Sequence, residues 1–202
     1  MNLLREYIRE ILVEGMRQPS DLPHSHVVVV NEVEPGYVEF YYGNADGEAI
    51  GNPMGTVEIE KFDDGKIGNC GGAWTVGGSG ADQGWGPMLY DVAIEWATLN
   101  GEGLISDRSS VSGEAKGVWQ YYMQNRGDVT AHQLDDPMDT LTPGVEEDNC
   151  DQEVAGGFRQ GWNEDIEAPP DPEWMNSPLS KRYTKTPSTM SDLKRVGKLV
   201  VL

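Results

Sequence analysis

Five glycines fall within the ten residues from Gly77 to Gly86, and a helix-forming run follows directly, in the sequence GGSGADQGWGPMLYDVAIEWA. Glycine loses more conformational freedom on folding than any other residue, so this density needs a physical reason. Two interpretations compete. Either the glycines let the backbone approach a phosphate-bearing cofactor at the start of the helix, or they form a tight corner between two elements.

The run after the glycines predicts an amphipathic helix. Pro87 suits the first helical position, where its missing N–H group is not needed. Leu89, Val92, Ala93 and Trp96 share one face, and the sequence LNGEG predicts the end of the helix.

Before the glycines, the sequence predicts strands. β-Branched and aromatic residues are dense between Val27 and Val76, and the turn signals EPG and DDG interrupt them. We expect an antiparallel meander of about four strands, carried by the sequences HVVVVNEV, YVEFYYG, GTVEIEKF and AWTV.

After the helix, the sequence GLIS predicts a short buried strand, and Ser112 is a plausible N-cap for a second helix. Ala115, Val118, Trp119 and Tyr122 continue that helix as an apolar stripe. DVTAHQL then returns as another strand.

We divide the chain into three parts. Residues 1–21 form an amphipathic helix and a linker, residues 22–134 form the core, and residues 135–202 form a loop-rich C-terminal extension. Thirteen acids and one base between Asp135 and Glu173 give that stretch a charge of −12, and six bases and one acid from Lys181 onward give +5.

The net charge of the 202 residues is −19, which repels nucleic-acid backbones and anionic membrane surfaces. We therefore expect no nucleic-acid or membrane partner; an acidic mimic of nucleic acid is the weakest interpretation of the charge. No apolar run is long enough to span a membrane, and charges interrupt the N-terminal helix, so no secretory signal peptide is predicted.

Cys70 and Cys150 are the only cysteines. Two buried thiols in a reducing compartment are the simpler expectation, and one disulfide between them is the alternative. No histidine or cysteine stands at metal-ligand spacing from enough partners, so no metal is predicted.

The order of elements and the sequence QGWGPM resemble the GNAT (Gcn5-related N-acetyltransferase) family. That family has Gln or Arg, two variable residues, Gly, a variable residue, then Gly or Ala; Gln83, Gly84 and Gly86 fit, and Met88 stands where a small residue is usual. Ser112 and Ala115 also fit, whereas Trp119 occupies a position often held by tyrosine. The resemblance covers residues 27–134 and implies an α+β fold with a mixed, mostly antiparallel sheet flanked by helices.

The resemblance implies acetyl-CoA as a substrate and an amine as acyl acceptor, either a small molecule or a basic protein. It implies that these residues bind the coenzyme: Val76, Gln83, Gly84, Trp85, Gly86, Pro87 and Met88. Tyr122 is the candidate acid for the departing thiolate, and Asp82 is a candidate base, as is Asp107.

The start MNLLREYIREILVEG resembles the leader peptides of proteins packaged in the heads of tailed phages, which end at a site of the form Leu or Ile, any residue, Glu. This implies a phage-encoded protein of the host cytoplasm that is packaged in the virion with head components, and cleavage before Gly15; a helix that docks on the core is the alternative. Two functions are carried forward: an acyl-CoA-dependent N-acyltransferase, and a noncatalytic internal or interaction protein of a phage on a GNAT-like scaffold.

Overall fold

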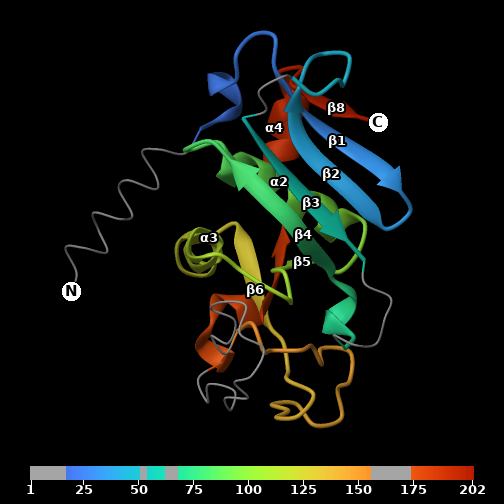
Figure 1. Ribbon diagram of the computed structural model, residues 1–202, viewed down its shortest axis with the longest axis vertical. Helices are drawn as coiled ribbons and strands as arrows, with labels where there is room; N and C mark the ends of the chain where they lie inside the picture. The colour runs from blue at the N-terminus through green and yellow to red at the C-terminus, as the bar shows by residue number, and fades with distance from the viewer. Residues whose placement is uncertain (1–16, 51–53, 62–67, 156–173) are drawn as a thin grey trace, which may run out of the picture. The chain divides into compact units, whose positions relative to one another are not determined.

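The structure is a computed structural model that describes residues 17–50, 54–61, 68–155 and 174–202. The predicted helix in residues 1–14 and the turn DDG lie outside this part of the chain. The described residues form an α+β fold with eight strands and three α-helices. Figure 1 shows the elements in chain order by colour.

The elements follow one another as the sequence predicts as far as residue 133. They are β1 (Val27–Glu34), β2 (Tyr37–Gly43), β3 (Gly55–Glu60), β4 (Trp74–Ala81), α2 (Gly86–Leu99), β5 (Leu104–Ile105), α3 (Gly113–Asn125) and β6 (Val129–Gln133). Beyond them, the structure adds β7 (Lys181–Lys185), α4 (Thr189–Arg195) and β8 (Leu199–Val201), which the sequence analysis did not predict.

The chain forms two compact units. Of the described residues, the first unit holds 17–50, 54–59, 78–93 and 187–202, and the second holds 60–61, 68–77, 94–155 and 174–186. β4 and α2 each contribute residues to both units, so each unit is described by itself below.

In the first unit the strands follow the order β4-β3-β2-β1-β8. β1 and β2 are antiparallel, and β8 lies parallel to β1 with Val28 opposite Leu199 (Figure 1). Val28, Val29 and Val30 are buried, because β1 lies between two strands and the apolar run suits burial on both faces.

In the second unit the strands follow the order β6-β7-β5-β4. β4 and β5 are parallel, and β7 is antiparallel to both β5 and β6. Trp119 packs against Tyr183 of β7 with ring centroids 4.9 Å apart, and both side chains are fully buried. The expected mixed sheet is therefore present, with parallel pairs at β4–β5 and β1–β8.

α2 differs from the expected amphipathic helix, because every residue from Met88 to Ala97 is buried. Leu89, Val92 and Ala93 lie on the predicted apolar face, and Asp91 and Glu95 are buried as well. α2 is therefore an interior helix, and its charged residues need polar partners.

Candidate functional site

The turn between β4 and α2 is held by the chain on both flanks. Gly84 has a φ of 86°, a left-handed conformation that favours glycine. Its carbonyl accepts a hydrogen bond from the Arg17 amide at 3.1 Å, and the Trp85 carbonyl accepts one from the Tyr42 hydroxyl at 2.7 Å. The glycine stretch thus contains a true backbone corner at Gly84.

The turn leads directly into the start of α2. The Trp85 amide donates to the Asp82 carbonyl at 3.1 Å, and Pro87 has no amide hydrogen. Gly86 and Met88 belong to the first turn of α2, and amides in the first turn of a helix have no intrahelical acceptor. Amides at a helix start and the positive end of the helix dipole together form the kind of place where an anion binds.

Gly86 leaves room beside these amides. A Cβ atom built at Gly86 would meet only the Cβ of Ala81, at 3.4 Å, which is ordinary contact. A Cβ atom at this position, in the first turn of α2, therefore fits the fold.

β4 extends past its parallel partner. The β4–β5 register covers Trp74 opposite Leu104 and Thr75 opposite Ile105, where β5 ends, whereas β4 continues to Ala81. The register with β5 ends at Thr75. Because the Trp74 amide donates to the Gly103 carbonyl at 2.8 Å, the same parallel ladder directs the Val76 amide to the Ile105 carbonyl, and β4 continues beyond this ladder from Gly77.

The other predicted residues lie in different surroundings. Asp82 and Gln83 are exposed in the first unit, and the Asp82 amide donates to the Met54 carbonyl at 2.8 Å. Tyr122 belongs to α3 of the second unit and is 1% exposed; its ring lies 5.3 Å from the Arg126 guanidinium carbon. Asp107 accepts hydrogen bonds from the amide and hydroxyl of Ser109, which makes it part of a local turn.

A cluster that the sequence analysis missed lies on one face of the sheet in the first unit. The Tyr37 hydroxyl donates to Glu58 at 2.9 Å and lies 3.4 Å from Glu39, so a phenol on β2 joins carboxylates of β2 and β3. Burial, together with the Glu58 and Glu39 charges, raises the pKa of the Tyr37 hydroxyl to about 12. Glu58 Oε2 also lies 3.3 Å from the place of a Cβ atom at Gly78, so this carboxylate lies directly over β4.

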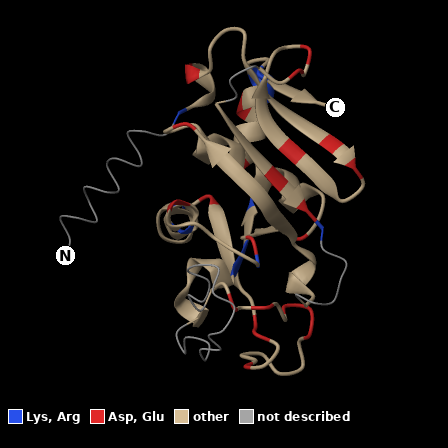
Figure 2. Ribbon diagram, in the orientation of Figure 1, with Lys and Arg blue, Asp and Glu red and all other residues tan. Residues whose placement is uncertain are grey.

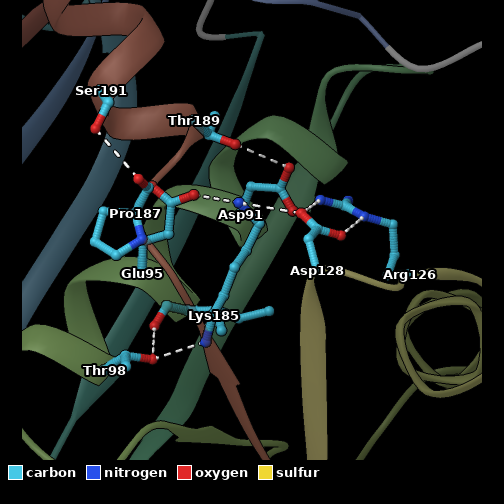
Figure 3. A network of polar contacts seen from close by, with 10 residues as sticks. Asp91, Glu95, Thr98, Arg126, Asp128, Lys185, Pro187, Thr189 and Ser191 are labelled. Carbon is cyan, nitrogen blue, oxygen red and sulfur yellow. Dashed lines mark hydrogen bonds and ion pairs between the residues drawn. The ribbon is translucent and has the colours of Figure 1, made fainter.

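The second unit contains a buried ion pair that was also missed. Lys185 of β7 is 1% exposed and pairs with Glu95, which is fully buried (Figure 3). Lys185 Nζ also lies 3.4 Å from the Asp128 carboxylate, which Arg126 holds through two hydrogen bonds of 2.8 and 2.7 Å. Hydrogen bonding from Arg126 lowers the pKa of the Asp128 carboxyl to about 2. The sequence signal was Glu95 between Ile94 and Trp96, a charge within an apolar helix.

Arg108 is a structural centre of the second unit. Its guanidinium donates to the carbonyls of Ser106 and Asp151 and to the Ser106 hydroxyl, and burial lowers its pKa to about 10. All of these acceptors belong to the chain itself. Arg108 therefore connects the residues that follow β5 to the backbone at Asp151.

Cys70 and Cys150 form a disulfide, so the expectation of two free thiols is wrong. The two residues are 80 positions apart and both are buried. Gly68 and Cys150 also form a β-bridge, and the Cys70 amide donates to the Asn149 carbonyl at 3.0 Å. These long-range contacts, which no local pattern encodes, bring the two sulfurs together.

Comparisons with protein-family models, with curated proteins and with solved structures found no match to this chain. Among the described residues there is no group of three histidine, cysteine or acidic side chains that could hold a metal ion. None of the described helices has the length and apolar character that crossing a membrane requires.

Proposed function

We propose that this chain is an acyl-CoA-dependent N-acyltransferase. The observation that carries the proposal is the end of the β4–β5 register at Thr75, followed along the chain by a glycine turn at Gly84 and by the start of α2 at Gly86. The element order from β1 to β6, which prompted the resemblance to GNAT proteins, supports the same proposal.

In this proposal the residues of the turn bind the coenzyme. The amides of Gly84, Gly86 and Met88 would donate to the pyrophosphate of acetyl-CoA, and the Gln83 side chain would add a donor. A backbone amide near Val76 or Gly77 would donate a hydrogen bond to the thioester carbonyl. Trp85 would contribute by shaping the turn, because its own amide already donates to Asp82.

The reaction would be a direct transfer. The amine nitrogen attacks the thioester carbonyl carbon, the C–S bond breaks, and the acyl group moves to nitrogen. The amine gives up one proton to a carboxylate, directly or through water, and the thiolate takes one proton from an acid. Asp82 stays the predicted base and Tyr122 the predicted acid; Glu58 joins Asp82 as a candidate because it lies over Gly78 of β4.

The acceptor would be a neutral amine group on a molecule that carries further positive charges. Glu39 and Glu58 lie on neighbouring strands around one tyrosine hydroxyl, and two carboxylates at that spacing attract a positive charge. The net charge of −19 favours the same class of acceptor over long range.

Thermal unfolding with and without acetyl-CoA tests the proposal. A ligand at one hundred times its dissociation constant stabilises the folded state by about 2.7 kcal/mol, so the melting temperature should rise. Gly86→Glu should abolish the rise, because a carboxylate would stand beside the pyrophosphate, and glutamate in the first turn favours the helix itself. Gly86→Ala is the matched control and should keep the rise. No shift in the wild-type protein at millimolar acetyl-CoA would refute coenzyme binding.

The noncatalytic phage interaction protein is the second candidate. Trp119 stands at the position where the resemblance expects a tyrosine, and it is a core residue packed on Tyr183. Binding of acetyl-CoA without release of coenzyme A thiol in the presence of spermidine or a lysine-rich peptide would favour this candidate. Mass spectrometry of protein from virions tests the predicted packaging, which requires a mature chain that begins at Gly15.

A further inference from the structure

Residues 136–147, here called the acidic loop, form a closed surface loop in the second unit. At its base, the Asp135 amide donates to the Asp148 carbonyl at 2.9 Å, and the Cys150 amide donates to the Asp135 carbonyl at 2.8 Å. The ends of the loop are therefore side by side, as in the compact loops that often carry function.

Contacts inside the acidic loop fix its shape. The buried Asp135 carboxylate accepts hydrogen bonds from the Thr142 amide at 2.7 Å and from the Thr142 hydroxyl at 2.8 Å. Asp136 and Asp139 form a β-bridge around Met138, and the Cys70–Cys150 disulfide anchors the segment that follows. A loop that is shaped before it binds loses little conformational entropy on binding.

The acidic loop exposes apolar side chains. Met138 is 94% exposed, Leu141 is 42% exposed and Val145 is 45% exposed. Three large apolar side chains within eight residues are more than the scattered single ones that ordinary surfaces carry. None of the three belongs to the buried core that the described residues form.

Charge surrounds these apolar side chains. Residues 135–151 contain seven acids and no lysine, arginine or histidine, and Figure 2 shows the acidic residues along this segment. A partner must therefore combine an apolar surface with positive charges around it. A partner surface that is acidic, or that is apolar without charges, would provide no positive charge to pair with the acids of the loop.

We infer that the acidic loop docks a partner protein that presents lysine or arginine side chains around exposed apolar side chains. Met138 and Leu141 insert into the apolar centre of that surface, and the acids of the loop pair with its basic rim. This inference does not depend on the proposed acyltransferase function.

Two synthetic peptides test it with the full chain. One is an amphipathic helical peptide of lysine and leucine, and the other has the same number of lysines with glutamine in place of leucine. By fluorescence anisotropy the wild-type protein should bind the lysine–leucine peptide roughly tenfold more tightly or better, because two apolar side chains become buried. Hydrogen exchange of amides 136–147 should slow when that peptide is bound.

The decisive variant is Met138→Ser/Leu141→Ser. It should lose the preference for the lysine–leucine peptide and keep the affinity for the lysine–glutamine peptide, which depends on charge alone. Val33→Ser/Leu99→Ser is the matched control, because these side chains are 52% and 60% exposed outside the loop, and it should keep the preference. The inference is overturned if the double serine variant keeps the preference, if protection falls outside the loop, or if sedimentation shows a dimer that this variant dissociates.

Discussion

Lys185 places a positive charge in the interior of the second unit, where only other charges can compensate it. Its Nζ atom lies between the Glu95 and Asp128 carboxylates, and Glu95 is fully buried. A buried pair of this kind contributes modestly to stability while it is intact, but the loss of one partner leaves a charge without compensation.

Lys185→Met should therefore lower the free energy of unfolding by about 3–5 kcal/mol, because Glu95 stays buried without its cation. The double variant Lys185→Met/Glu95→Leu should recover much of that loss. Urea unfolding followed by tryptophan fluorescence measures both values. Lys116→Met, at an exposed position of α3 in the same unit, is the control and should have a small effect. A double variant that is as unstable as the sum of its single changes would contradict the expectation.

The Asp128 carboxylate, which lies 3.4 Å from Lys185 Nζ, makes the free energy of unfolding depend on pH. Because its folded pKa of about 2 lies below the ordinary value of about 3.9, the unfolded chain binds protons first as the pH falls. The stabilisation that Asp128 provides is complete at pH values above its pKa in the unfolded chain. It is lost as the pH falls through its pKa in the folded protein. Unfolding titrations of wild type and Asp128→Asn should therefore differ most at neutral pH and converge towards pH 2. A constant difference across that range would rule out Asp128 as the source.

At the scale of elements, the sequence predicts what local signals encode. Ser112 is the N-cap of α3, and its hydroxyl accepts a hydrogen bond from the Ala115 amide at 3.1 Å, as predicted. β7 and β8 were missed because KRYTK is polar and LVV is short, and each is a strand only through its neighbours. Likewise the turn at Gly84 follows from its glycine, whereas the Tyr37–Glu58 contact joins residues 21 positions apart and has no local signal.

The disulfide gives the strongest prediction at this scale. A link that closes about 80 residues should stabilise the fold by roughly 4 kcal/mol, by restricting the unfolded chain. Reduction of the wild-type protein should lower its melting temperature, and Cys70→Ser/Cys150→Ser should lower it by a similar amount. The double serine variant should not respond to reductant. An unchanged melting temperature after complete reduction, verified by thiol titration, would contradict this.

For the molecule as a whole, the α+β class and the mixed sheet follow from the sequence, but the division into compact units does not. The predicted boundaries at residues 21 and 134 cut the sequence into consecutive parts, whereas each unit draws on separate segments. Segments far apart in sequence combine through pairings such as β1 with β8. The turn at Gly84 was predictable from its glycines, whereas the exposure of Asp82 and the burial of Tyr122 were not.

The net charge of −19 predicts a dependence of stability on salt. Repulsion among the acids destabilises the compact state, and the screening length shortens from about 30 Å at 0.01 M to about 8 Å at 0.15 M salt. The melting temperature at neutral pH should therefore rise with sodium chloride over this range, as calorimetry would show. Near the isoelectric point of about 4.3 the rise should vanish. A fall with salt would mean that the ion pairs outweigh the repulsion.

The parallel pairing of β1 with β8 also bears on how the protein is made. A ribosome that adds about 5–20 residues per second takes roughly ten to thirty seconds between the end of β1 at residue 34 and the start of β8 at residue 199. During that interval the nascent chain carries four consecutive valines, Val27 to Val30, on a strand that still lacks β8 as its neighbour. Chaperone capture during translation should therefore concentrate on this strand.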